Sequence, residues 1–320
     1  MPLTREMMYC AARIIGDIKI VDKNDKVTGT RRGTIGTGFC LTVQGERAEY
    51  GYLLTADHVV EGQKKVEVQF ADFFGEGEMY APLAVTEWRR PPGDVDLAVA
   101  PLREIPGISA RNVTVLEMEK HVIPNEKVGR VYLGSHVFYI GIFDPLDRPM
   151  ARSGTIGALD QEGIEHDEGY VYMAHLVDCR SYDGFSGSPV FAELNYAGLK
   201  PTEPPVERPK EHEEVPIGQI FSTAMICGMF TEHVDENNAD GAISRYGVGV
   251  MVRGEEITAA LTSEGFVNER QEWDAEIAAQ AATGPRLRNA GKRSVPADEF
   301  DRFEDLTRKL VQVPKPDKPL

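Results

Sequence analysis

Residues 181–191 read Ser-Tyr-Asp-Gly-Phe-Ser-Gly-Ser-Pro-Val-Phe. Ser186 lies between Gly184 and Gly187, and an apolar run begins after Pro189. Glycines on both sides of a serine allow a tight turn and let another molecule approach the hydroxyl group closely. The same residues are also typical of a plain turn between two strands. This turn is of chemical interest only if the chain also supplies a base and an acid for Ser186.

Length and composition place the chain among soluble globular proteins. Its 320 residues are 42% hydrophobic and 27% charged, which suffices for one large or two ordinary domains. The 31 glycines and 20 prolines indicate many turns and therefore a β-rich chain. No apolar run approaches the ~20 residues that a membrane-spanning helix needs. The first ten residues lack the apolar stretch of a secretory signal, so none is expected.

The cysteines and the net charge exclude several classes of function. The four cysteines lie far apart without a Cys-x-x-Cys pair, so we predict neither a zinc site nor a disulfide framework. This spacing favours a reducing compartment, and we predict a cytoplasmic protein without a metal or another cofactor. The formal net charge of −16 disfavours nucleic acid and anionic membranes as partners, since both attract clustered Lys and Arg.

Short apolar runs separated by turn residues recur along most of the chain, which is typical of an all-β barrel or sandwich. A first set of strands is expected at Arg13–Val21, Gly38–Val43, Tyr50–Thr55, Lys65–Phe70, Ala84–Trp88 and Leu97–Pro101. A second set is expected at Val137–Ile142, Ala151–Leu159, Val171–Val177, Pro189–Phe191, Ile220–Phe230 and Gly247–Val252. The proline- and glutamate-rich residues at about 196–216 interrupt the second set and predict a surface insertion.

The C-terminal part of the chain is expected to be helical. Glu255–Leu261 predicts a short helix that closes the second set, and alanine-rich Glu269–Ala282 predicts another. Residues 296–313 place apolar side chains at near-helical spacing with charges between them. Such a helix either docks on the parent domain or binds a partner protein. Amphipathicity alone does not separate these alternatives, and docking is the one we favour.

Two residues are candidates for the base and the acid that Ser186 needs. His58 directly follows an apolar run, and of the seven histidines it is the only one in that context. Asp96 leads into the apolar run Leu97–Val99, whereas the nearby Asp94 is expected to be a turn residue. A serine hydroxyl becomes a nucleophile when a neutral imidazole, held by a carboxylate, accepts its proton. A structural role is the alternative for each residue taken alone.

The order of these residues along the chain separates two classes of hydrolase. The α/β-hydrolases carry Gly-x-Ser-x-Gly and place the histidine last. Here Ser188 replaces the second glycine and His58 comes first. The β-rich sequence also lacks the alternating helices of that fold, so this class is excluded.

The order His58, Asp96, Ser186 and its flanking residues resemble the trypsin-like (chymotrypsin-fold) serine proteases, and most closely their bacterial HtrA/Deg-like branch. The resemblance covers about residues 10–262 and rests on the segments Gly36–Phe39, Gly51–Val60, Asp96–Val99, Gly134–Gly141, Ser153–Ile156, Gly184–Pro189, Met225–Met229 and Gly247–Val250. It implies an all-β fold of two six-stranded antiparallel β-barrels. The first would span residues 1–105 and the second residues 106–264, with a helical C-terminal extension at 265–320.

The resemblance further implies a serine endopeptidase that cleaves proteins or peptides through an acyl-enzyme intermediate. Its triad would be His58, Asp96 and Ser186, and the N–H groups of Gly184 and Ser186 would form the oxyanion hole. The alternative is a catalytically silent or partner-activated trypsin-like fold that serves as a binding module, with residues 296–313 as the candidate partner helix.

Some positions depart from the family pattern. Phe185 stands where the digestive enzymes have the aspartate that captures a new N-terminus, so activation by clipping is not expected. The residues after Leu261 are too few for a PDZ domain. By the family's spacing Arg180 falls near the base of the primary specificity pocket, where it would favour an acidic substrate side chain; exposure to solvent or pairing with an internal acid is the alternative. Along the wall of that pocket fall Cys227, Gly228, Met229, Phe230 and Thr231.

Overall fold

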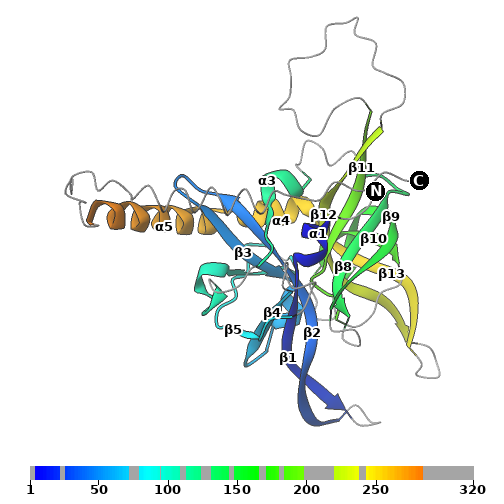
Figure 1. Cartoon of the computed structure of the whole chain (residues 1–320). Helices are drawn as coiled ribbons and strands as arrows, with labels where there is room; N and C mark the ends of the chain where they lie inside the picture. The colour runs from blue at the N-terminus through cyan, green and yellow to red at the C-terminus, as the bar shows by residue number, and fades with distance from the viewer. Residues whose placement is uncertain are drawn as a thin grey trace, which may run out of the picture. The chain divides into compact units, whose positions relative to one another are not determined.

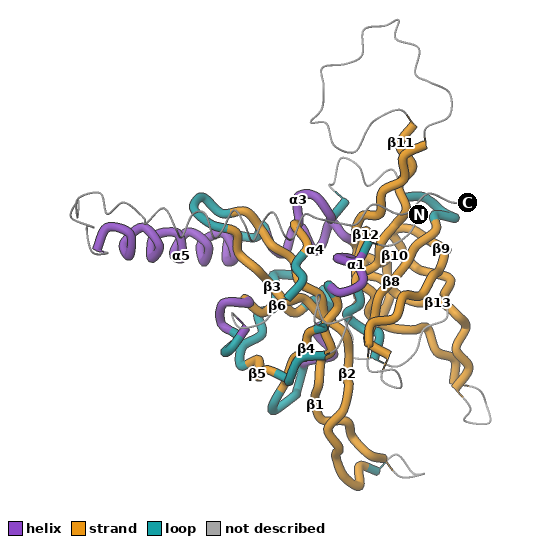
Figure 2. Tube along the Cα trace, in the orientation of Figure 1, coloured by secondary structure: helices purple, strands orange, loops and turns teal. Residues whose placement is uncertain are grey.

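Strands dominate the structure, as the sequence predicts (Figure 2). The chain divides into two compact units, Met1–Asp274 and Ala275–Leu320, and both sheets belong to the first. The computed structural model describes residues 4–21, 26–71, 79–93, 95–108, 113–123, 131–143, 148–165, 171–179, 184–197, 220–237 and 243–283.

The first sheet has seven strands. Six follow the order β5-β4-β1-β2-β3-β6, and β7 pairs in parallel with β2. Figure 1 labels β1 to β5 of this sheet. They are β1 (Ala11–Val21), β2 (Val27–Gln44), β3 (Glu49–Thr55), β4 (Val66–Phe70), β5 (Leu83–Val85), β6 (Ala98–Pro101) and β7 (Leu116–Glu117). Among the strands that the structure describes, the short β5 forms a ladder with β4 alone. In the described residues a single bridge, Arg89↔Val99, connects the chain after β5 to β6. The sheet is therefore an open half-barrel, where a closed barrel was expected.

The second sheet is a closed antiparallel barrel in the order β10-β13-β12-β11-β8-β9. Its strands are β8 (His136–Phe143), β9 (Arg148–Glu165), β10 (Val171–Cys179), β11 (Pro189–Ala197), β12 (Ile220–Asn237) and β13 (Ile243–Arg253). β11 runs beyond the expected Phe191 because its outer end pairs with β12 as far as Ala197↔Ile220. The expected insertion at 196–216 lies almost wholly outside the described residues. Together, the half-barrel and the closed barrel confirm the predicted chymotrypsin-like fold.

In the part of the chain that the structure describes, helices are few, as the sequence predicts. They are α1 (Arg5–Tyr9), α2 (Asp57–Val60), the 3-10 turn η1 (Leu102–Glu104), α3 (Met118–His121), α4 (Gly254–Leu261) and α5 (Glu264–Thr283). α4 is the expected closing helix, and α5 begins before the expected Glu269. The expected helix at 296–313 lies outside the described residues, and the predicted domain limits stay predictions. Among the helices that the structure describes, none is both long and apolar enough to span a bilayer.

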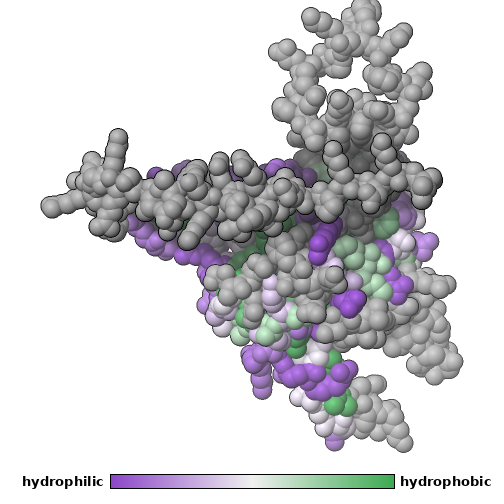
Figure 3. All heavy atoms as spheres, viewed as in Figure 1, coloured by the Kyte–Doolittle hydropathy of each residue, from purple (hydrophilic) through white to green (hydrophobic). Residues whose placement is uncertain are grey.

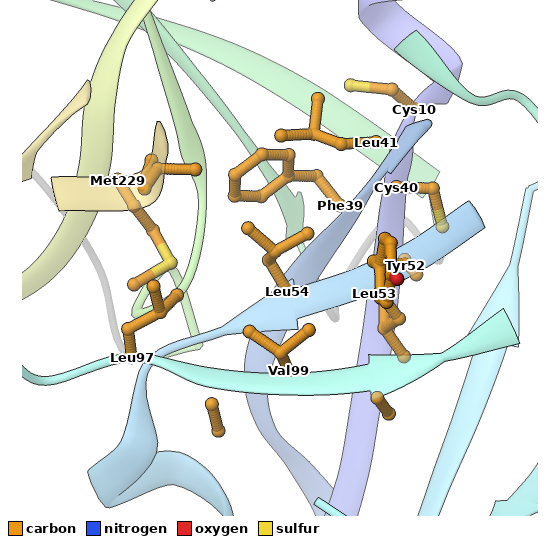
Figure 4. Close-up of a cluster of buried hydrophobic side chains, with 14 of the residues drawn as sticks. Cys10, Phe39, Cys40, Leu41, Tyr52, Leu53, Leu54, Leu97, Val99 and Met229 are labelled. Carbon is orange, nitrogen blue, oxygen red and sulfur yellow. The ribbon is translucent and has the colours of Figure 1, made fainter. Parts of the chain in front are cut away.

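One hydrophobic core joins the two sheets. Phe39, Leu54 and Val99 are fully buried and point toward one another (Figure 4). Met229 of β12, also fully buried, belongs to the same cluster. Burying such a side chain contributes about 1.5–3 kcal/mol, so shared packing holds β12 against the first sheet. Hydrophilic residues are spread over much of the described surface on the face in Figure 3, in keeping with the high net charge.

The carboxylate of Asp274 in α5 is bound to the first sheet. It accepts hydrogen bonds from the backbone N–H groups of Glu46 and Arg47, at 2.9 and 3.0 Å, and from the Tyr50 hydroxyl at 2.6 Å. Asp274 is almost fully buried, so these bonds replace the water that the carboxylate loses.

Aromatic packing fastens the same helix. The ring centroids of Trp273 and Tyr50 are 5.2 Å apart. Phe266 packs edge-on against Tyr52, with their ring centroids 5.6 Å apart. Buried Arg270 donates to the carbonyl of Leu261 at 2.9 Å. The beginning of the predicted C-terminal extension is thus an integral part of the first compact unit.

We predict that Asp274→Asn lowers the melting temperature at pH 7, and that the difference shrinks under acid conditions. The hydrogen bond from Tyr50 and the backbone donors lower the pKa of Asp274. A lowered pKa stabilises the fold above the usual aspartate pKa of ~4, and this stabilisation is lost as the pH falls through the lowered value. Thermal melts between pH 7 and pH 3 test this.

The matched control for this series is Asp17→Asn, because Asp17 forms an exposed ion pair with Arg32 and such pairs contribute little to stability. Equal melting temperatures of Asp274→Asn and the wild type at pH 7 would contradict the role of this carboxylate.

Candidate active site

His58 is held at the junction of β3 and α2. The end of β3 is buried on both faces, and Val59 and Val60 of α2 are buried as well. These neighbours fix the backbone, while the His58 side chain keeps 24% of its surface exposed. The imidazole is therefore anchored on one side and open to solvent on the other.

Asp96 binds His58 through both carboxylate oxygens. Oδ1 accepts from the backbone N–H of His58 at 3.0 Å, and Oδ2 lies 2.8 Å from Nδ1. A carboxylate only accepts, so Nδ1 carries the proton, and in the neutral ring Nε2 is then the nitrogen with the lone pair that can accept a proton. The Asp96 side chain is only 5% exposed, since the fully buried Leu97 follows it. The structure therefore brings together the predicted base and acid in the orientation that base catalysis needs.

Another buried acid lies next to His58 in the sequence but has a different partner. Asp57 accepts from Nε of Arg90 at 2.8 and 2.6 Å. Burial raises the pKa of Asp57, and the hydrogen bond and charge of Arg90 act against this rise. Asp57 is thus engaged by a cation, whereas Asp96 faces the imidazole. Asp94, which was expected to be a turn residue, lies outside the described residues.

Ser186 lies in a turn that both sheets hold. Its carbonyl accepts from Thr37 N–H of β2 at 2.8 Å, and Gly187 N–H donates to the carbonyl of Phe230 in β12 at 2.7 Å. Gly184 and Gly187 have φ angles of +92° and +87°, a region that favours glycine. These two glycines let the chain reverse direction around a partly exposed Ser186.

The turn with Ser186 and the helix with His58 meet at Gly36 of β2. A Cβ atom on Gly36 would lie 2.6 Å from Val59, the residue after His58, and 3.0 Å from the carbonyl oxygen of Ser186. The absence of a side chain at Gly36 therefore lets both segments approach the same point of the first sheet.

Phe185 anchors the loop next to Ser186. It is fully buried, and its ring meets Tyr139 edge-on at 5.7 Å. A Cβ atom on Gly141 would lie 2.5 Å from the Phe185 ring, so this glycine makes room for it. The position that holds an activating aspartate in the digestive enzymes is thus filled here by an apolar anchor.

The backbone N–H groups of Gly184 and Ser186 are the predicted oxyanion-hole donors. Within the described part of the chain, neither donates to a backbone carbonyl. An oxyanion hole needs N–H groups that can bind the substrate oxygen, and this role of Gly184 and Ser186 stays a prediction.

The predicted specificity residues are only partly described. Arg180 lies outside the described residues. Cys227, Met229, Phe230 and Thr231 of β12 are buried, and a Cβ atom on Gly228 would lie 2.3 Å from the carbonyl of Val252. Cys227 and Phe230 belong to the core of the second barrel, whereas Met229 belongs to the core shared with the first sheet. The place of these residues in the wall of a substrate pocket stays a prediction.

The cysteines are poor alternatives to Ser186 as nucleophiles. All four are buried free thiols. Burial raises the pKa of Cys179 to about 11 and that of Cys227 to about 12, and the thiolate is the reactive form. Among the described residues, no group of three His, Cys, Asp or Glu side chains is placed to hold a metal ion.

The fold and the bound His–Asp pair define a protein of the chymotrypsin-like two-barrel class. A model of the trypsin-like peptidase domain matches residues 36–196, which is half of the chain. The chain therefore belongs to the trypsin-like peptidase family. No curated protein matches it significantly.

Solved structures similar to the chain include several proteases. The HtrA-type protease AlgW, solved with a decapeptide, is 14% identical with a TM-score of 0.45, and the match covers 81% of this chain and 66% of AlgW. The MamO protease domain from Magnetospirillum magneticum is 14% identical with a TM-score of 0.45, covering 81% and 98%. The Rv3671c protease in its inactive form is 15% identical with a TM-score of 0.42, covering 80% and 88%. The chain thus spans just under two thirds of AlgW.

Proposed function

We propose that this protein is a serine endopeptidase in which His58, Asp96 and Ser186 form the catalytic triad. The observation that carries the proposal is the double hydrogen bond from His58 to buried Asp96. It leaves Nε2 as the basic atom of the neutral imidazole. The turn around Ser186 supports the proposal, since it lies against the same strand, β2, as the helix with His58.

In the proposed mechanism His58 Nε2 takes the proton of Ser186 Oγ as this oxygen attacks the substrate carbonyl carbon. The electron pair of the C=O bond moves to its oxygen, which the N–H groups of Gly184 and Ser186 stabilise. His58 then gives its proton to the leaving amine, and an acyl-enzyme remains. His58 then takes a proton from a water molecule as the water oxygen attacks the acyl carbon. The bond between this carbon and Ser186 Oγ breaks, and His58 returns the proton to Oγ, which restores the enzyme. Apart from the substrate and this water molecule, every group in these steps belongs to the chain.

The substrate is proposed to be a protein or peptide. Arg180 and the β12 residues 227–231 stay the proposed specificity residues, and the helix at 296–313 stays a proposed partner site. The four free thiols are in keeping with a reducing compartment such as a bacterial cytoplasm, which we propose as the place of action.

A fluorophosphonate probe, which reacts with an activated serine, tests the proposal. We expect labelling of the wild type and none of Ser186→Ala or His58→Ala, because the first lacks the nucleophile and the second its base. Ser188→Ala is the matched control and is expected to be labelled. In the wild type the Ser188 hydroxyl lies two residues after Ser186. It is buried and has no hydrogen-bond partner among the described residues. A folded wild type that stays unlabelled would overturn the proposal in favour of a silent or partner-activated binding module.

A further inference from the structure

The hydroxyl group of Thr37, on β2 of the first sheet, bonds to the second barrel. Thr37 is fully buried. Its Oγ1 donates to the carbonyl of Gly184 at 2.7 Å and accepts from the backbone N–H of Ile142 in β8 at 3.2 Å. A carbonyl only accepts and an N–H only donates, so the direction of both bonds is fixed. The hydroxyl therefore bridges β8 and the loop before Ser186 through two hydrogen bonds.

The backbone of Thr37 holds the segments on either side of the same loop. Its N–H donates to the carbonyl of Ser186 at 2.8 Å. Its carbonyl accepts from Oγ1 of Thr55 at 2.7 Å, three residues before His58. One residue thus contacts the loop with the nucleophile and the strand that leads to the base.

These bonds restrict the direction of the loop amides. The carbonyls of Gly184 and Ser186 are both bound by Thr37, and that of Phe185 accepts from Ser188 N–H at 3.0 Å. The C=O and N–H of one peptide unit point in opposite directions. The Phe185 carbonyl therefore sets the direction of the Ser186 N–H, and the bonds to the Gly184 and Ser186 carbonyls hold the peptide units on either side of it.

We propose that Thr37 is a positioning residue for the oxyanion hole. Its hydroxyl holds the Gly184 carbonyl, and with it the peptide unit next to the one that carries the Ser186 N–H. This inference deepens the proposed function and rests on it. If the hydroxyl only filled space in the core, an isosteric valine would serve equally well.

The kinetic test compares Thr37→Val, Thr37→Ser and Thr42→Val on a peptide ester substrate. Misdirected oxyanion donors act mainly on the transition state. We therefore expect kcat of Thr37→Val to fall by about 10- to 100-fold, with KM changed less than about threefold. Thr37→Ser keeps the hydroxyl and is expected to restore most of kcat. Thr42 also lies buried on β2. Thr42→Val therefore measures the general effect of replacing a buried threonine of this strand with valine.

Amide hydrogen exchange separates this inference from the proposed function. We expect the Ile142 amide to exchange at least about tenfold faster in Thr37→Val than in the wild type, because its acceptor is lost, and at the wild-type rate in Thr37→Ser. Thr37→Ala replaces the valine variant if that variant does not fold. Unchanged exchange, or a kcat equal to that of Thr42→Val, overturns the positioning role. If the variants differ in exchange as expected but the wild type has no activity, the proposed function is overturned instead. The role of Thr37 in catalysis is then overturned with it.

Discussion

Replacing Asp96 with asparagine is expected to lower kcat by about 10⁴-fold, an effect typical of a triad that loses its acid. Both oxygens of Asp96 accept hydrogen bonds from His58, one from the backbone N–H and one from Nδ1–H. Asparagine offers one oxygen and one NH₂ group, so it matches only one of these donors. With NH₂ toward the ring, the proton moves to Nε2, which then cannot accept the proton of Ser186.

The measurement is kcat and kcat/KM on a peptide ester, with circular dichroism melts to show that the variant folds. Asp57→Asn is the matched control, because Asp57 is a neighbouring buried acid that binds Arg90 instead of the imidazole. We expect it to change kcat less than about tenfold. Equal losses in the two variants would show that the effect of Asp96 comes from stability rather than from the orientation of His58.

Gly187→Ala is expected to abolish activity and to destabilise the protein by about 4 kcal/mol. A Cβ atom at this position would lie 1.9 Å from the carbonyl oxygen of Thr37 and 2.4 Å from Oγ1 of Thr55. The first of these is a backbone atom that cannot rotate away, so the turn with Ser186 must leave the first sheet. The positive φ angle adds about 1–2 kcal/mol of strain for a residue with a Cβ atom.

Urea unfolding measures the loss of stability. Gly134→Ala separates the strain of the positive φ angle from the steric clash of the added Cβ atom. Gly134 has a φ angle of +85°, close to the +87° of Gly187, but a Cβ atom there meets nothing within 4 Å. The control is therefore expected to show only the strain, about 1–2 kcal/mol, and to keep its activity. Similar losses for both variants would contradict a close approach of the turn to Thr37.

The sequence alone determined the order of the strands and the candidate chemistry. Alternation of apolar runs and turn residues is a local property, so every expected strand overlaps an observed one, and only the two-residue β7 was not expected among the strands that the structure describes. The residues around His58 and Asp96 also lie in local contexts that sequence motifs describe, and the structure brings these two side chains together. The catalytic roles assigned to them with Ser186 stay predictions until the labelling is done.

Contacts between distant segments were decided only by the tertiary structure. Thr37 belongs to a motif visible in the sequence, but its hydroxyl bonds to Gly184 and Ile142, more than a hundred residues away. The hydrogen bond between Asp274 and Tyr50 and the packing of Phe185 against Tyr139 likewise leave no local pattern in the sequence that would predict them. A buried polar group must find its partner wherever the fold provides one, and that partner follows from the packing of two sheets rather than from spacing along the chain.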